Sequence, residues 1–160
     1  EAAAGLAGTP LTKARLQIKE VNGVQFLDDS YNANPDSMKA ALQTLVELDA
    51  DGKRIAVLGE MRELGNETQR GHEEVGEAAA SFEVDHLIGI GEMGAIIVRA
   101  AKKAGLEKST AVGSTSEAAK RLLDIAEAGD LVLIKGSRLA RTEEVIEHFA
   151  HLSSPEGARV

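Results

Sequence analysis

The chain contains no cysteine and few aromatic side chains among its 160 residues. The absence of cysteine excludes disulfide bonds and thiolate chemistry. Aromatic residues make up only 2% of the chain and apolar residues make up 43%, so the core must be built from aliphatic side chains. That composition favours aliphatic strands covered by helices over an all-β sandwich. The length suits one compact domain with a hydrophobic core of its own.

Positive charge is also scarce. Lysine and arginine together number 18 against 26 acidic residues, which gives a formal net charge of −8. Such a surface repels phosphate backbones and anionic lipids, which argues against nucleic-acid and membrane-surface partners. The sequence shows no signal peptide and no apolar run long enough to span a bilayer. We therefore expect a cytoplasmic protein.

The hydrophobic pattern predicts strands that alternate with helices. Residues 15–21 and 24–28 have strand character and flank Asn22 and Gly23, a pair that is a strong hairpin signal. A helix is predicted at 35–48, with Asn34 as its N-cap and Pro35 at its first position. Further helices are predicted at 68–82, 93–104, 114–129 and 143–151, and further strands at 54–59, 85–90, 110–113 and 130–134.

Strands separated by helices of this length form right-handed βαβ units. We therefore predict an α/β, Rossmann-like three-layer domain, with a mostly parallel sheet and an N-terminal antiparallel hairpin strand at its edge. This domain is expected to span residues 14–152. Residues 1–13 read either as the tail of a helix or as a disordered terminus, and residues 153–160 read as a frayed tail.

The loop after the first predicted parallel strand is the leading candidate site, because ligands in open α/β sheets bind beyond the carboxyl ends of the strands. Residues 28–35 read DDSYNANP and contain the one tyrosine of the chain. An aromatic ring can stack on a base, carboxamides can read its edge, and a carboxylate can accept hydrogen bonds from ribose hydroxyls. A turn rich in Asp and Asn is the alternative; it explains Asn34 but not Tyr31.

Two further loops carry charged groups in the same kind of position. Residues 59–65 read GEMRELG, which suits either recognition of a charged group or a solvated loop with internal ion pairs. Residues 135–138 read KGSR, an anion-binding cluster suited to carboxylate or phosphate oxygens, with a charged strand end as the alternative. His72 follows the second loop, and a lone histidine there favours a structural role, because no second histidine is spaced for metal ligation.

Residues 89–94 form a G-x-G-x-x-G pattern between a strand and a helix, the signature of dinucleotide-binding domains. However, the end of the following strand, at 111–113, has no acidic residue, and Glu92 would repel a pyrophosphate. We interpret these glycines as turn and packing residues and keep a free-standing dinucleotide-binding oxidoreductase domain as the competing hypothesis. The chain also lacks a phosphate loop, a nucleophile elbow and zinc-type spacing, so a self-contained enzyme is hard to assemble from it.

Three stretches, in this order, resemble the Mur ligase family: residues 28–38 (DDSYNANPDSM), residues 57–65 (VLGEMRELG) followed by His72 and Gly76, and residues 130–138 (DLVLIKGSR). The resemblance covers roughly 14–150 and implies the third, C-terminal domain of a three-domain enzyme. It would also explain residues 1–13 as the end of the central ATPase domain. Two positions depart from the family pattern: Ala14 stands where glycine is usual, and Thr142 where an apolar residue is common.

The resemblance implies an ATP-dependent ligase that joins D-alanyl-D-alanine to UDP-MurNAc-tripeptide in cytoplasmic peptidoglycan precursor synthesis. ATP would phosphorylate the tripeptide carboxylate, and the dipeptide amine would then displace phosphate. ATP and Mg²⁺ would be held mainly by the central domain. The present domain would close over ATP and the incoming dipeptide, with its own N-terminal and central domains as partners, and would be inactive alone.

The same resemblance implies roles for individual residues. The residues that would contact adenine and ribose are Asp29, Tyr31, Asn32 and Asn34. Those that would face the dipeptide carboxylate or the transferring phosphate are Lys135, Ser137 and Arg138. The loop from Glu60 to Gly65, which includes Arg62, would complete the pocket. The resemblance assigns no catalytic residue and no metal ligand to this chain.

Overall fold

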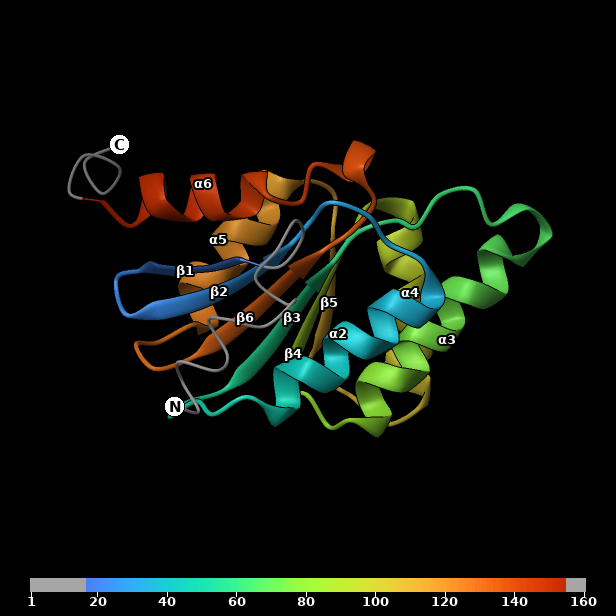
Figure 1. Ribbon diagram of the computed structural model, residues 1–160, viewed down its shortest axis with the longest axis horizontal. Coiled ribbons are helices and arrows are strands. Elements are labelled where there is room, and N and C mark those ends of the chain that lie inside the picture. Colours follow the sequence, from blue (N-terminus) through green and yellow to red (C-terminus); the bar gives the residue numbers. More distant parts are fainter. Residues whose placement is uncertain (1–16, 155–160) are drawn as a thin grey trace.

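The computed structural model describes residues 17–154, and its central feature is a six-stranded sheet with strand order β1-β2-β6-β3-β4-β5 (Figure 1). The strands are β1 (Gln17–Val21), β2 (Val24–Asp29), β3 (Arg54–Leu58), β4 (His86–Ile90), β5 (Ser109–Val112) and β6 (Leu131–Lys135). The helices are α2 (Pro35–Glu47), α3 (Thr68–Ser81), α4 (Gly91–Lys103), α5 (Thr115–Ile125) and α6 (Glu144–Leu152), with short 3-10 helices η2 (Gly65–Glu67) and η3 (Arg138–Ala140).

The sheet is parallel except for β1, which pairs antiparallel with β2 at the edge. The predicted α/β class and the antiparallel hairpin strand are therefore confirmed. The hairpin turns at Asn22 and Gly23, whose φ angles of 52° and 84° are both positive. Positive φ at both central residues matches the twist of the two strands and is typical of the Asn-Gly turn.

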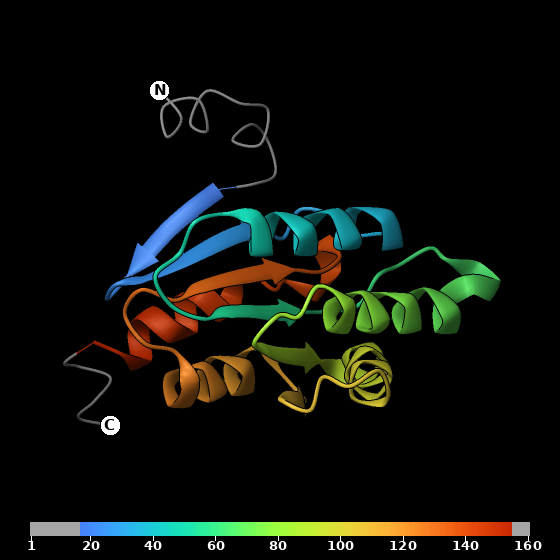
Figure 2. The same cartoon turned by 90° about the horizontal axis from the view of Figure 1, so that it is seen from below.

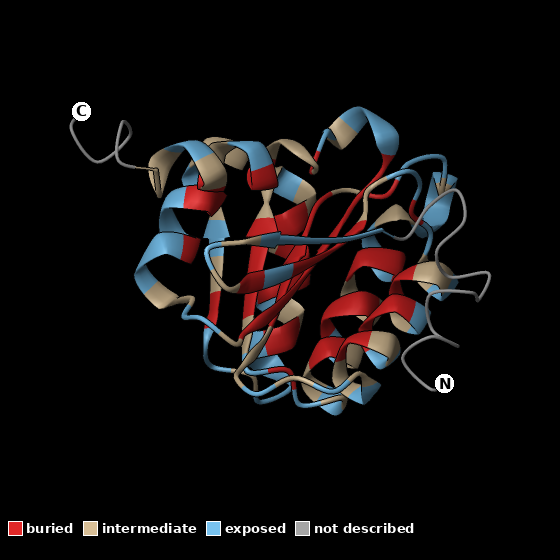
Figure 3. Ribbon diagram, turned by 60° about the vertical axis from the view of Figure 1, so that its left-hand side comes forward, coloured by how far each residue is buried: buried red, intermediate tan, exposed pale blue. Residues whose placement is uncertain are grey.

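Helices cover both faces of the sheet (Figures 1 and 2). Side chains of α2, α3 and α4 pack on one face, and those of α5 and α6 pack on the other. Strand β6 shows why its run of four apolar residues predicts a central strand: Leu131 and Leu133 belong to one core cluster, and Val132 and Ile134 to the other. The buried residues accordingly concentrate in the central strands, while β1 is exposed (Figure 3).

Helix α2 begins as its sequence predicts. The side chain of Asn34 accepts a hydrogen bond from the backbone N–H of Ser37, and the hydroxyl of Ser37 accepts one from the backbone N–H of Asn34. Pro35 occupies the first position of the helix, where its missing N–H is not needed. This reciprocal cap fixes the direction in which the chain leaves the loop before α2.

The end of α5 differs from the prediction. The helix was predicted to run to Gly129, but it ends at Ile125. The buried carboxylate of Asp130 accepts hydrogen bonds from the backbone N–H groups of Lys53 and Glu127. Because this long-range contact fixes residues 127–130 in a loop, it overrides the local helical pattern. Helix α4 also begins at Gly91, two residues before its predicted start, and neither 3-10 helix was predicted.

Several predictions lie outside the described residues, including the tail at 1–13, the start of the first strand at Arg15, and residues 155–160 of the predicted C-terminal tail. Within residues 17–154, no helix combines the length and apolar character needed to cross a membrane.

Candidate functional site

The three loops singled out from the sequence leave neighbouring strands. Strand β6 lies between β2 and β3, and all three run parallel. The loops after β2, β6 and β3 therefore emerge side by side at the carboxyl edge of the sheet, the edge at which α/β domains bind ligands. The structure thus brings together the three candidate loops, which lie far apart in the sequence.

The loop after β2 is fixed at its far end and exposes its tyrosine. Ala33 is buried, and Asn34 caps helix α2. The Asn32 side chain bends back and accepts a hydrogen bond from the backbone N–H of Ala33 at 2.9 Å. Tyr31 is 47% exposed, a large aromatic surface for this chain. The predicted nucleotide-binding residues therefore share one short loop whose aromatic ring faces solvent.

Lys135 joins this loop to the end of β6. Its ammonium donates hydrogen bonds to the Asp29 carboxylate at 2.9 Å and to the backbone carbonyl of Asn32 at 2.8 Å. Lys135 is only 2% exposed. The prediction that Lys135 faces a dipeptide or phosphate stays a prediction, while the structure places its ammonium against the predicted nucleotide loop.

The loop after β3 is joined to the loop after β6 by backbone hydrogen bonds. The N–H of Gly59 donates to the carbonyl of Lys135 at 2.9 Å, and the N–H of Ser137 donates to the carbonyl of Glu60 at 2.8 Å. Ser137 is buried, and its hydroxyl has no hydrogen-bond partner within the described residues. A buried hydroxyl without a partner is costly, so Ser137 keeps an unused hydrogen-bonding capacity at this edge of the sheet.

Glycine is required where these two loops meet. A Cβ on Gly59 or on Gly136 would lie 2.9 Å or 2.8 Å from the side-chain methyl of Thr142. The glycines therefore let the two backbones approach each other while Thr142 packs over both. Glu60 and Arg62, also predicted site residues, form an ion pair at 3.2 Å within their own loop. Because the hydrogen bond and ion pair of Arg62 stay within its own loop, the structure groups Arg62 less closely with the loops after β2 and β6 than it groups the other predicted residues.

Arg138 lies beside Tyr31. Its guanidinium carbon is 5.4 Å from the centre of the Tyr31 ring, a distance at which a cation is attracted to an aromatic face. Both residues line an open cavity of about 290 Å³ together with Gln17, Lys19, Asp28, Ser30 and Glu143. The pair places an aromatic ring and an exposed guanidinium at one point of the carboxyl edge.

His72 supports the loop after β3 from inside the protein. Its Nε2 accepts a hydrogen bond from the backbone N–H of Met61 at 2.9 Å, and its Nδ1 lies 2.7 Å from the carbonyl of Thr68. These contacts select the tautomer that carries its proton on Nδ1, because that nitrogen faces a carbonyl oxygen. His72 is fully buried, in keeping with the structural role favoured from the sequence.

Comparison with known proteins decides the family. Residues 14–138 match the sequence profile described as "Mur ligase, glutamate ligase domain". The chain belongs to the Mur ligase family. It is 38% identical over 152 residues to UDP-N-acetylmuramoyl-tripeptide–D-alanyl-D-alanine ligase of Bacillus subtilis, covering 92% of this chain and 33% of that protein. It is 38% identical over 144 residues to the Escherichia coli ligase of the same name, covering 89% of this chain and 31% of that protein. The chain therefore spans about a third of the length of these relatives.

Solved structures agree with this assignment. The crystal structure of MurF from Acinetobacter baumannii matches with a TM-score of 0.77 at 28% identity, covering 86% of this chain and 30% of that one. MurF ligase from Thermotoga maritima, solved in complex with ADP, matches with a TM-score of 0.74 at 27% identity, covering 99% of this chain and 36% of that one. The chain therefore matches about a third of each of these longer structures.

The glycine-rich turn between β4 and α4 has a packing role in this Mur ligase domain. A Cβ on Gly89 would lie 2.2 Å from the carbonyl oxygen of Gly94, so the two glycines allow the helix to rest directly on its strand. Gly91 has a φ of +80°, which turns the chain from strand to helix. The exposed carboxylate of Glu92 lines the adjacent cavity. Nothing in the family match supports the oxidoreductase alternative.

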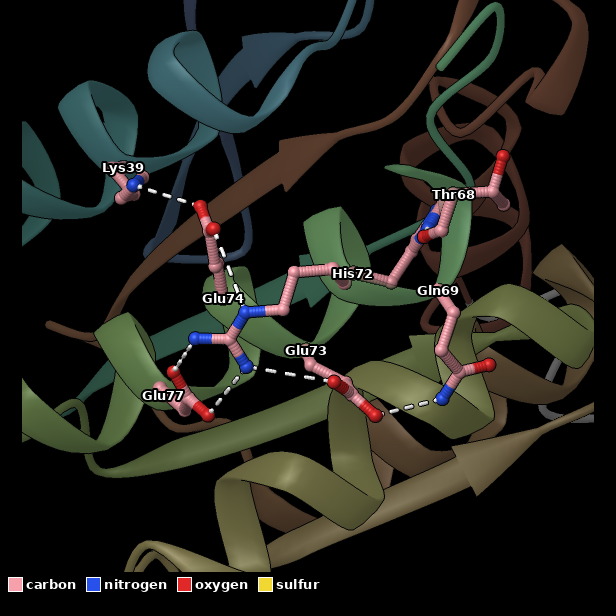
Figure 4. Close-up of polar contacts among 8 residues, drawn as sticks. Lys39, Thr68, Gln69, His72, Glu73, Glu74 and Glu77 are labelled. Carbon is pink, nitrogen blue, oxygen red and sulfur yellow. Dashed lines mark hydrogen bonds and ion pairs between the residues drawn. The ribbon is translucent and has the colours of Figure 1, made fainter. Parts of the chain in front are cut away.

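A cavity of about 570 Å³ lies between α3 and α4, away from the three loops. Its rim carries an ion-pair network on the Mur ligase domain surface, in which Arg70 contacts Glu77 at 3.2 Å and Glu73 at 3.5 Å (Figure 4). The hydrogen bond with Glu77, followed by its charge, raises the pKa of Arg70, and the hydrogen bond from Gln69 lowers the pKa of Glu73. Because these groups are exposed, the network contributes little to stability.

The described part of the Mur ligase domain provides no ready-made metal site. Within residues 17–154, no group of three or more histidine, aspartate or glutamate side chains converges. At the carboxyl edge, the Asp29 carboxylate is engaged by Lys135 and the Glu60 carboxylate by Arg62. Each of these two carboxylates is therefore already paired with a cationic side chain.

Proposed function

We propose that the chain is the C-terminal domain of an ATP-dependent ligase that joins D-alanyl-D-alanine to UDP-MurNAc-tripeptide in peptidoglycan precursor synthesis. The proposal is supported by the 38% identity to two ligases of that name. The observation that carries it is the convergence of the loops after β2, β3 and β6 at one edge of the sheet. That edge presents the Tyr31 ring with the guanidinium of Arg138 beside it, and the buried hydroxyl of Ser137 lies next to Arg138 in the chain.

In this proposal the loop after β2 forms the adenosine wall of the nucleotide pocket. The ring of Tyr31 stacks on adenine, and Asp29, Asn32 and Asn34 surround the base and ribose. Ser137 and Arg138 face the carboxylate of the incoming dipeptide or the transferring phosphate, with Glu60 and Arg62 along the rim. These assignments follow the chemistry of the side chains: an aromatic face suits a base, and a guanidinium suits a planar oxyanion.

The remaining domains of the ligase supply the phosphate-binding half of the site. The sequence contains no phosphate-loop motif, and within residues 17–154 no group of three or more histidine, aspartate or glutamate side chains converges. The N-terminal and central domains of a full-length cytoplasmic enzyme are therefore its proposed partners, and they hold most of the ATP and Mg²⁺. In the full enzyme this domain closes over the bound substrates, and on its own it has no ligase activity. Product formation by the purified chain with ATP, Mg²⁺ and both substrates would contradict this.

Binding of an adenine nucleotide to the isolated chain tests the proposed pocket. We expect ADP to shift the amide NMR signals of residues 29–34 with a Kd of about 1 mM, since half of the contacts are missing. Tyr31→Ala should weaken this binding about tenfold, because a base stacked on an aromatic ring is stabilised by about 1–3 kcal/mol. Asn32→Ala should weaken it severalfold, because it removes a hydrogen-bonding side chain that contributes about 0.5–1.5 kcal/mol.

Gln43→Ala provides the matched control, since Gln43 is an exposed carboxamide on α2 that bonds to Glu47. It should leave the ADP shifts unchanged. Absence of any shift in the unmodified chain at several times the expected Kd would overturn the proposed nucleotide site. Equal weakening by Gln43→Ala would show that the effect is not specific to the loop.

A further inference from the structure

Lys135 is the residue through which the end of β6 holds the loop after β2. We propose that Lys135 is a positioning residue: its buried ammonium fixes the loop of residues 29–34 in the conformation that presents Tyr31 and Asn32 to the nucleotide. This inference rests on the proposed function of that loop as a nucleotide wall.

The sheet itself places Lys135 for this task. Asp29 and Lys135 are register partners on adjacent parallel strands, so their side chains project from the same face of the sheet. The ammonium donates to the Asp29 carboxylate at 2.9 Å and to the Asn32 carbonyl at 2.8 Å. One side chain therefore binds both the first residue of the loop and a backbone atom three residues later.

The other end of the loop is fixed separately. Ala33 is buried against the core, and Asn34 forms the reciprocal cap of α2 with Ser37. Tyr31 lies between this anchor and the contacts of Lys135. A loop held at both ends has few backbone conformations available, so its exposed ring is kept in place before any ligand binds.

The same two contacts neutralise the charge of Lys135 and occupy its ammonium group. Its side chain is 3% exposed and forms an ion pair with Asp29, which is 15% exposed. A buried ammonium engaged by a carboxylate and a carbonyl has little attraction left for a phosphate or a substrate carboxylate. Arg138, which is exposed beside Tyr31, is better placed to meet an anion directly.

The test compares loop order and ADP affinity in the 160-residue chain and its variants. Lys135→Met removes the ammonium and keeps the length of the side chain, while Lys135→Arg keeps the charge. The matched control is Lys53→Met, which removes a lysine paired with the buried Asp130 at the opposite end of the sheet, at 3.1 Å. Backbone ¹⁵N relaxation reports the order of residues 31–33 and requires no nucleotide.

We expect the order parameters of residues 31–33 to fall in Lys135→Met from about 0.85 to below about 0.6. The ADP Kd should rise about tenfold, because only a fraction of the loops then adopts the binding conformation. Lys135→Arg should retain part of the order, and Lys53→Met should leave both the loop and the ADP affinity unchanged.

A second variant covers the case in which Lys135→Met does not fold. The double change Asp29→Asn with Lys135→Met removes both charges of the pair and leaves no buried carboxylate unpaired, and it should show the same loss of loop order. Unchanged order parameters in a folded variant lacking the ammonium would overturn the positioning role. Failure of the unmodified chain to bind ADP would count against the proposed function alone, because the relaxation measurement is independent of it.

Discussion

Replacing Thr142 by valine should stabilise the protein. Thr142 is fully buried, and its hydroxyl has no hydrogen-bond partner within residues 17–154. Its side-chain methyl fills the space over Gly59 and Gly136, where a Cβ on either glycine would lie within 3 Å of it. Valine keeps that methyl and replaces the hydroxyl by a second one. Because a buried polar group without a partner costs about 1–3 kcal/mol, we expect a gain of about 1 kcal/mol.

Urea unfolding followed by circular dichroism measures this gain. For a chain of this length, about 1 kcal/mol corresponds to a rise in Tm of about 2–4 °C, and the dependence on urea should keep its slope. Thr142→Ser is the matched variant, because it keeps the hydroxyl and removes the methyl; it should destabilise the chain by about 1 kcal/mol. If Thr142→Val were less stable than the unmodified chain, the hydroxyl would have a partner in solution, such as a buried water, and the reasoning would be refuted.

Two further substitutions test the packing of α3 against α4 at Gly76 and the protonation of His86 at the start of β4. Gly76→Ala should destabilise the chain by about 2 kcal/mol in urea unfolding, since its Cβ would lie 2.2 Å from the carbonyl oxygen of Ile97; Gly71→Ala meets only side-chain tips and should cost less. Burial, and next the charge of Lys108, lowers the pKa of His86, so its stabilising contribution is present above about pH 6.5 and lost as the pH falls through the folded-state pKa. Replacing His86 by glutamine should flatten the decline of stability in acid, and an unaltered pH profile would contradict that cause.

The parts of the fold that follow local rules were predictable from the sequence. The Asn22-Gly23 turn and the Asn34 cap depend on a few neighbouring residues. The apolar run of β6 predicts burial on both faces, as found. The end of α5 was not predictable, because it depends on the carboxylate of Asp130 bonding to a segment far away in the sequence.

The same distinction between local rules and long-range contacts applies to the candidate site. The parallel strands predict that the loops after them meet at one edge, and the structure brings three of these loops together. The contact of Lys135 with Asp29 could not be predicted, since it requires knowing that β6 lies next to β2 in the sheet. The hydrogen bond from the backbone N–H of Met61 to His72 could not be predicted either, because it forms only once the chain is folded. A histidine eleven residues from its partner gives no sequence signal beyond the expectation that a lone histidine is structural.

The charges at the carboxyl edge bear on the proposal that another domain holds the triphosphate. Lys135 is paired with Asp29, and Arg62 is paired with Glu60. Arg138 is exposed beside Tyr31, where its guanidinium can meet an anionic group. One exposed guanidinium, on a chain with a net charge of −8, cannot offset the several negative charges of ATP. These charges support the proposal that the edge meets the adenosine part of a nucleotide and a single carboxylate, and that another domain supplies the cations that bind the phosphates.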